Sequence, residues 1–352
     1  MLSITSDAIV KILLVTFPND LGSRTIEANL IKFISKFSDL QVFRFAAHDS
    51  DSIDKRLDNR RNIFRRIQDT LKLRKHVKQA VREERKILFY NISPALFALG
   101  SWRNGEAYIT LDWARRLLVN HALNDRDPMT RVHKLVLKSC KGILPMTDAM
   151  ADCLRNDYDM AEERIHRVPS LFDVEYFDPG NISTGPELKL LFIGGDIYRK
   201  GGDLLYQAFA GRLHRHCKLT MVTNGDLEPC EGLTLAKGVR YGTPEHLNLM
   251  RSHDVFILPT REDAGPQVIG EAASAGLAVF TTRFALGAPH VVIDKMTGAI
   301  ADTPEDCIKQ LENLLQNPDE LKKMRQRSLD HMRQSFSPAA IVAAFQGGLS
   351  NK

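Results

Sequence analysis

Short apolar runs alternate with longer segments in which apolar residues recur every three or four positions. The short runs are apolar on both faces, which is typical of strands buried in a parallel sheet, and the longer segments are typical of amphipathic helices. The predicted strands cover residues 10–16, 41–45, 87–90, 108–111, 142–146, 189–193, 219–222, 255–258 and 278–281, and predicted helices include 24–37, 147–156 and 203–213. This alternation favours an α/β protein with doubly wound parallel sheets.

A linker-like stretch divides the chain into halves of similar size. Residues 177–186 contain two prolines, two glycines and several small polar residues. Each half opens on a lysine-associated strand, around Lys11 and Lys189. We therefore predict two Rossmann-like domains that face a cleft, over residues 1–180 and 181–335. The tail, residues 336–352, is predicted to form a helix that returns to the N-terminal domain.

The composition indicates a soluble globular protein, with 43% hydrophobic and 26% charged residues among 352. The sequence contains no run of about 18 apolar residues, the length that a transmembrane helix needs. The first residues lack the basic and apolar pattern of a signal peptide. The five cysteines are scattered without CxxC spacing, as expected of reduced thiols. We therefore expect a cytoplasmic protein.

The strand over residues 189–193 runs into a glycine-rich loop that carries two adjacent cations. Gly194 and Gly195 would let a ligand approach the backbone, and Arg199 and Lys200 supply positive charge for a phosphate. The loop is neither a GxxxxGK[ST] P-loop nor a GxGxxG fingerprint. In a parallel sheet, ligands bind at the carboxyl ends of strands, where this loop begins. The alternative is an ordinary turn with a solvated basic pair.

A second loop follows the strand over residues 255–258. It contains Asp263, and a helix is predicted to start near Pro266, because proline is favoured in a first helical turn. The free N–H groups at such a helix start form an anion site. Glu271 lies eight positions after Asp263, although a single helical glutamate is usually just solvated. A third loop, residues 281–290, is expected beside the second on the same sheet edge.

Together these loops resemble the C-terminal half of a retaining glycosyltransferase of glycosyltransferase family 4, with the GT-B fold. Gly194 and Lys200 keep the family's spacing from glycine turn to lysine. Residues 258–260 keep its strand ending, with Thr260 for serine, and Asp263 and Glu271 fit its E-x7-E motif with aspartate first. Residues 276–280 and 287–290 complete the series, with histidine for the final glutamate. The pattern covers about 40% of the chain.

The resemblance implies transfer of a sugar from a nucleotide-sugar, such as a UDP- or GDP-sugar, with retention at the anomeric carbon. Arg199, Lys200 and the helix start would stabilise the departing diphosphate without a metal. Asp263 would bind sugar hydroxyls and Glu271 the ribose hydroxyls. The predicted donor-binding residues are Gly194, Gly195, Thr260, Tyr241, Gly265, Pro266, Gln267, Val268 and Glu271.

The N-terminal half resembles the family more faintly. Gly22 and Ser23 stand where the family has a glycine-rich loop on the acceptor side. After the strand over residues 108–111, the family's histidine is replaced by Asp112. Asp112 is the candidate for contacting the donor sugar or the acceptor hydroxyl, and a capping aspartate is the alternative. The implied acceptor is a glycan, a lipid-linked acceptor or a small molecule.

One segment makes the protein basic. Residues 55–86 contain thirteen Lys or Arg and four acids, a charge of +9, so the rest of a chain of net charge +5 sums to −4. Apolar residues at 57, 64, 67 and 71 form one helical face, and the phase then slips before Val77, which predicts a bend or a second helix. One interpretation is a solvated helix packed on the N-terminal sheet. The other is attraction of residues 53–86 to an anionic inner membrane surface. No RNA-binding signature supports a nucleic-acid partner.

Two metal signals are weak, so we predict no metal. Asp-x-Asp occurs three times in different contexts, at residues 49–51, 125–127 and 157–159, and a His-Arg-His-Cys run at 214–217 has no second half. Two other functions stay open: a nucleotide-sugar epimerase of the same fold, and a nucleotide-sugar-binding pseudoenzyme. The x7-spaced acids favour the transferase over the epimerase. A dehydrogenase is disfavoured because neither half has GxGxxG.

Overall fold

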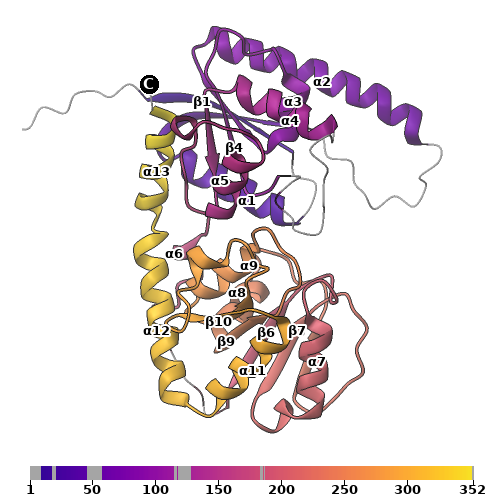
Figure 1. The fold of residues 1–352 in the computed structure, drawn as a ribbon, viewed down its shortest axis with the longest axis vertical. Helices are drawn as coiled ribbons and strands as arrows, with labels where there is room; N and C mark the ends of the chain where they lie inside the picture. The colour runs from indigo at the N-terminus through magenta and orange to yellow at the C-terminus, as the bar shows by residue number, and fades with distance from the viewer. Residues whose placement is uncertain are drawn as a thin grey trace, which may run out of the picture. The chain divides into compact units, whose positions relative to one another are not determined.

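The computed structural model describes residues 9–17, 21–45, 58–114, 117, 128–182, 185 and 187–350. The chain forms two compact units (Figure 1). Unit 1 comprises Met1–Leu171 with Ile341–Lys352, and unit 2 comprises Phe172–Ala340. The contacts thus divide the chain shortly before the predicted linker at 177–186. Each unit has its own hydrophobic core.

Unit 1 is a five-stranded parallel sheet with helices. The strand order is β2 (Ser38–Arg44), β1 (Val10–Thr16), β3 (Lys86–Tyr90), β4 (Ala107–Leu111) and β5 (Gly142–Pro145). The helices are α1 (Leu21–Ile34), α2 (Asp58–Arg82), α3 (Ile92–Ala98), α4 (Pro128–Ser139), α5 (Asp148–Asn156) and the 3-10 turn η1 (Glu162–Arg164). Strands β1, β3, β4 and β5 bury apolar residues on both faces, as the continuous apolar runs predict, whereas the edge strand β2 has no buried residue.

The C-terminal helix α13 (Pro338–Ser350) belongs to unit 1 although the preceding helix belongs to unit 2. Ile341, Phe345 and Leu349 are buried in the core of unit 1, and Figure 1 shows α13 in yellow beside its strands. Lys86 Nζ donates to the carbonyl of Leu349, and the hydroxyl of Tyr108 donates to the same oxygen at 3.2 Å. These contacts attach the end of the chain to β3 and β4.

Unit 2 is a six-stranded parallel sheet. Its order is β11 (Gly298–Ala301), β10 (Ala278–Thr282), β9 (Val255–Leu258), β6 (Lys189–Ile193), β7 (Lys218–Val222) and β8 (Leu233–Ala236). Its helices are α6 (Val174–Phe177), α7 (Gly202–Gly211), η2 (Leu213–Arg215), α8 (Pro244–Ser252), α9 (Gln267–Ser274), α10 (Ala288–Val291), α11 (Pro304–Leu315) and α12 (Pro318–Ser335). From β6 the chain moves to β7 and β8 on one side, then returns to β9 on the other. The β6/β9 boundary is therefore the topological switch point, where sheets of this class bind ligands.

All nine predicted strands are present, and the described residues form two further strands that the sequence analysis missed. The edge strand β8 is only partly buried, and β11 consists of small residues with low strand propensity apart from Ile300, so neither produces a strong apolar run. The predicted bend in the basic segment is wrong for residues 58–82, which form one continuous helix of 25 residues. Its buried face is formed by Leu73, Val77 and Ala80, which keep helical spacing. Residues 53–57 lie outside the described residues.

Candidate functional site

Three loops meet at the carboxyl edge of the unit 2 sheet, where β6, β9 and β10 end side by side. The β6 and β9 loops are joined because the amide of Arg261 donates to the carbonyl of Arg199 at 2.8 Å. The β9 and β10 loops are joined because Asp263 exchanges backbone hydrogen bonds of 2.9 Å with Phe284 and Leu286. The predicted adjacency of the second and third loops is thus confirmed, and the first loop lies on the other side of the second.

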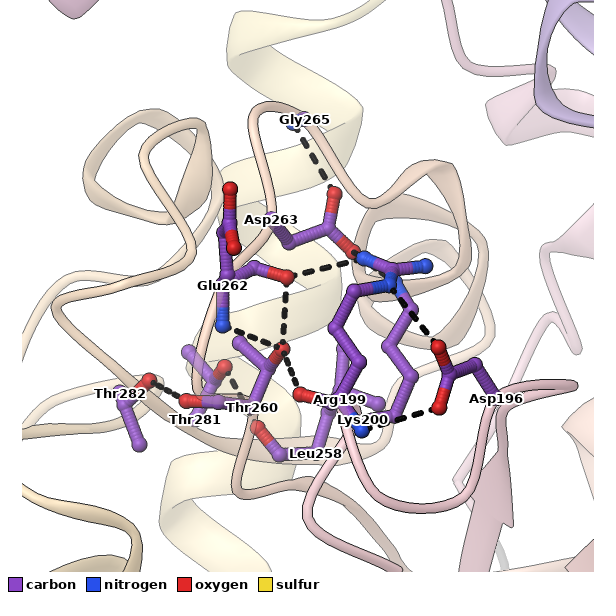
Figure 2. A network of polar contacts seen from close by, with 10 residues as sticks. All are labelled: Asp196, Arg199, Lys200, Leu258, Thr260, Glu262, Asp263, Gly265, Thr281 and Thr282. Atoms are coloured by element: carbon purple, nitrogen blue, oxygen red, sulfur yellow. Dashed lines mark hydrogen bonds and ion pairs between the residues drawn. The ribbon is translucent and has the colours of Figure 1, made fainter. Parts of the chain in front are cut away.

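A cluster of opposite charges lies at the switch point (Figure 2). Lys200 Nζ contacts Oδ2 of Asp263, and both side chains are largely buried. Arg199 Nη1 lies 3.8 Å from the same carboxylate oxygen, and Arg199 Nε lies 3.7 Å from Oδ2 of Asp196. Arg199 Nη1 also donates to the carbonyl of Glu262 at 2.9 Å. Two cations and two carboxylates from neighbouring loops are therefore held within a few ångströms.

The charge on Lys200 is sensitive to its surroundings. Burial lowers the pKa of its ammonium to about 7, and the nearby charge of Arg199 acts in the same direction. The Asp196 carboxylate opposes both effects. An incoming anion would favour the charged ammonium in the same way. Lys200 is thus a buried cation whose charge depends on what occupies the site.

Glycines allow the loops to approach closely. Gly201 has φ +72°, and a Cβ there would lie 1.9 Å from the carbonyl oxygen of Pro259, so no other residue fits without a shift of the β9 loop. A Cβ at Gly194 would lie 3.0 Å from side-chain carbons of Lys200. Gly195 has only an ordinary contact and Gly265 faces open space. The missing side chain at Gly194 therefore leaves room for the side chain of Lys200. Gly201, which the sequence pattern did not single out, permits the close approach of the β6 and β9 loops.

Helix α9 starts where the sequence predicts, after Pro266. Within the described part of the chain, the backbone amides of Gln267 and Val268 have no hydrogen-bond acceptor. The side-chain oxygen of Gln267 is buried and also lacks a partner there. The amide of Gly265 donates to Oδ1 of Asp263 at 3.3 Å. The start of α9 thus offers donors suited to an anion beside Asp263.

Thr260 joins two of the loops through its buried hydroxyl. It is fully buried, and its hydroxyl lies within hydrogen-bond distance of the carbonyls of Arg199, at 3.1 Å, and Glu262, at 3.2 Å. It therefore connects the β6 and β9 loops, and its hydroxyl is occupied by backbone.

Arg261 also connects the β9 loop to the β6 loop, a role that the sequence analysis missed. Its guanidinium donates two hydrogen bonds to the Asp203 carboxylate, at 2.8 and 2.9 Å, and stacks over the Tyr198 ring at 4.1 Å. Asp203 lies in the first turn of α7. Asp196, the partner of Arg199, and Asp203, the partner of Arg261, both lie in or just after the glycine-rich loop. Nothing in their spacing in the sequence specifies which cation each would meet.

Glu271 lies little more than one turn into α9 and is only 6% exposed. The alternative that it is an ordinary solvated glutamate is therefore wrong for this structure. His246 Nε2 lies 3.3 Å from its Oε2. The predicted residue Tyr241 packs against His246, with ring centroids 5.7 Å apart. His246 was missed because it lies on α8, and no local pattern links it to α9.

Two of the predicted residues of unit 1 lie on a helix, and the third lies at the carboxyl end of an inner strand. Gly22 and Ser23 lie in the first turn of α1, which begins at Leu21, so their placement in a loop is wrong. Amides in a first turn have no intrahelical acceptor, so the helix can start at these residues without losing hydrogen bonds. Asp112 follows β4, and its Oδ1 lies 3.4 Å from the Tyr90 hydroxyl. Its contact with a sugar or acceptor stays a prediction.

The described residues contain no group of three or more His, Cys, Asp or Glu side chains that could hold a metal ion. Two of the three Asp-x-Asp tripeptides, at 49–51 and 125–127, lie outside the described residues. In the third, Asp159 forms an ion pair with Lys134 at 2.6 Å. None of the helices in the described ranges combines the length and hydropathy needed to cross a membrane.

Part of the chain is similar in sequence to known proteins. Residues 187–317, which contain all three loops, match the family described as glycosyl transferases group 1. The chain is 26% identical over 172 residues to a putative glycosyltransferase, EpsF, of Bacillus subtilis strain 168, a match that covers 44% of this chain. The match spans 45% of that relative, less than half of its length.

Solved structures match nearly the whole chain. A glycosyltransferase from Rickettsia africae aligns with a TM-score of 0.73 and 15% identity, covering 98% of this chain and 100% of that one. HepE of Anabaena, solved with UDP and glucose, aligns with a TM-score of 0.74 and 14% identity, covering 97% and 100%. With its two parallel-sheet units, the chain therefore has the GT-B fold, and its C-terminal unit resembles the group 1 glycosyltransferases.

Proposed function

We propose that this protein is a retaining glycosyltransferase that moves a sugar from a nucleotide-sugar to an acceptor without a metal. The observation that carries the proposal is the position of Lys200, a buried cation at the switch point between β6 and β9. The anion-binding start of α9 and the match of residues 187–317 to the group 1 family support it.

The chemistry follows from the charge that develops on the leaving diphosphate. Lys200 and Arg199 would neutralise it, and the amides of Gln267 and Val268 would donate to its oxygens. Removing one such donor commonly raises the barrier by about 2.7–4 kcal/mol. Asp263, already held by the Gly265 amide, would accept hydrogen bonds from sugar hydroxyls once the diphosphate draws Lys200 away.

The remaining roles come from both units. Glu271 would accept the ribose hydroxyls, and Tyr241 and the adjacent loop would lie near the base. Asp112 of unit 1 is proposed to contact the donor sugar or the acceptor hydroxyl. The acceptor is proposed to be a glycan or a lipid-linked molecule. Because the HepE structure contains UDP and glucose, UDP-sugars are the first donors to test, followed by GDP-sugars.

We also propose that the protein is cytoplasmic and attaches peripherally to an anionic membrane surface through α2. Ile67 and Leu71, one turn apart on this helix, are 51% and 61% exposed. Lys75 and Lys78 continue the same face, as helical spacing requires, and both are exposed. An exposed stripe that is apolar at one end and basic at the other suits the interface of anionic lipids.

Vesicle sedimentation tests the membrane proposal. The protein should bind vesicles that contain phosphatidylserine, bind less at high salt, and lose binding on I67D/L71D. M296D is the control, because Met296 is also an exposed apolar residue but lies in unit 2. Equal binding of neutral and anionic vesicles, or unchanged binding of I67D/L71D, would refute attachment through this face.

A panel of nucleotide-sugars in EDTA tests the transferase proposal. One donor should raise the melting temperature of the wild type, and K200A should remove the shift, whereas K237A should keep it because Lys237 is an exposed residue paired with Asp226. NMR coupling constants of the transferred sugar then report retention. No donor binding would refute the proposal, binding without transfer to any acceptor would favour a pseudoenzyme, and a changed stereochemistry of the sugar without transfer would favour an epimerase.

A further inference from the structure

Glu271 has one polar side-chain partner among the described residues. That partner is His246, whose Nε2 lies 3.3 Å from Oε2 of the carboxylate. The two residues, His246 and Glu271, are 4% and 6% exposed, so water competes little for either. A buried carboxylate is expensive unless it is paired, and its orientation is set by the group that pairs with it. His246 therefore determines how Glu271 can present its other oxygen.

The backbone of His246 is held by the turn before α8. The hydroxyl of Thr243 caps the helix by accepting from the His246 amide at 3.3 Å. The preceding residue, Gly242, has φ +77°, and its carbonyl accepts a hydrogen bond from the Tyr176 hydroxyl at 3.1 Å. These contacts fix where the histidine leaves the backbone.

Aromatic packing then fixes the imidazole ring. Phe177 meets it edge to face, with centroids 5.6 Å apart and an interplanar angle of 87°. The Tyr241 ring lies against it at 5.7 Å. With two rings on its sides and a capped backbone, the imidazole has little freedom to turn away from Glu271.

The contact with the carboxylate shows which ring nitrogen donates. A carboxylate oxygen only accepts hydrogen bonds, so Nε2 of His246 carries the proton that points to Oε2 of Glu271. Nδ1 of His246 is buried and has no hydrogen-bond partner within the described residues, so the ring has no competing contact there. Oε1 of Glu271 then remains for a ligand.

We propose that His246 is a positioning residue for ribose recognition: it holds Oε2 of Glu271 so that Oε1 accepts the vicinal hydroxyls of the nucleotide. The proposal rests on the proposed function, because it assumes that Glu271 meets the ribose of a bound nucleotide. It adds a residue from α8 that contacts the carboxylate and not the nucleotide.

The test measures recognition of the hydroxyls and not affinity alone. The nucleoside diphosphate that stabilises the wild type is compared with its 2′,3′-dideoxy form by isothermal titration. Hydrogen bonds to a charged group imply a ribose preference of about tenfold or more in the wild type. E271Q should largely abolish the preference. H246F keeps an aromatic ring but no N–H, and should reduce the preference at least threefold, while H246Q, which retains an N–H donor, should restore most of it.

The outcomes separate the two proposals. If H246F prefers the ribose as strongly as the wild type does, while E271Q does not, the role of His246 is refuted and the proposed function stands. The role of His246 is also refuted if H246F and H246Q weaken both ligands equally, because that is the effect of a merely structural residue. If no nucleoside diphosphate binds the wild type, or E271Q keeps the preference, the proposed function itself is refuted at this site.

Discussion

The buried ammonium of Lys200 predicts that donor binding is coupled to proton uptake. With its pKa lowered to about 7 by burial, the Lys200 ammonium should be mostly uncharged at pH 8 and mostly charged at pH 6. A diphosphate beside Nζ restores the charged form, because opposite charge raises the pKa of an amine. Binding should therefore take up most of a proton at pH 8 and little at pH 6.

Affinity for the donor should fall as the pH rises above about 7. Burial depresses the pKa of Lys200, so its charge is lost as the pH rises through that value. Each pH unit should cost nearly tenfold in affinity, about 1.4 kcal/mol, until the pKa of the complex is reached. Below pH 6 affinity should level off, because Lys200 is then already charged.

Isothermal titration in several buffers measures the proton directly. At pH 8, the slope of the binding enthalpy against the buffer ionisation enthalpy should be clearly positive and approach +1, because binding takes up most of a proton. A nucleotide-sugar is the ligand of choice because its diphosphate has no group that titrates near this pH. K200M should remove the proton uptake, and K237M, at an exposed lysine, should leave it unchanged. A slope near zero at pH 8 in the wild type would show that the Asp263 carboxylate keeps Lys200 charged without ligand, and would refute the predicted proton uptake.

Two further predictions concern the framework of unit 2 and are read by chemical denaturation. G201A should lower the free energy of unfolding and weaken donor binding, because its Cβ would meet the Pro259 carbonyl oxygen at 1.9 Å. The control G211A, at the end of α7 where a Cβ meets open space, should be neutral or slightly stabilising. Equal effects of the two substitutions would refute the role of Gly201. R325M should lower the free energy of unfolding by about 3–5 kcal/mol, since it leaves the buried Asp254 carboxylate without its cation. In the wild type, Oδ1 of Asp254 lies 2.5 Å from Arg325 Nη1. R325M with wild-type stability would show that this ion pair contributes little.

The strands and the position of the site could be predicted because they depend on local pattern. Continuous apolar runs identify buried parallel strands, and the carboxyl ends of such strands share one edge. The loops that carry Lys200 and Asp263 were therefore both expected at this edge, and the structure places the two side chains in contact. The start of α9 after Pro266 follows from local helix chemistry in the same way.

What could not be predicted depends on which elements pack together. His246 meets Glu271 only because α8 and α9 lie against α6, and no spacing in the sequence records that packing. Helix α2 carries two apolar stripes, and the sequence does not reveal that Leu73 is buried while Leu71 is exposed. Gly201 is required by the carbonyl of a different loop, so its importance appears only in three dimensions.

A crystal structure of the protein with its preferred nucleotide-sugar, grown in EDTA, would show where the diphosphate binds. We expect the diphosphate within hydrogen-bond distance of Lys200 Nζ and of the amides of Gln267 and Val268. We also expect the ribose hydroxyls to lie against Glu271. A diphosphate bound away from the β6/β9 boundary, or one held by a chelator-sensitive metal, would contradict the proposed function.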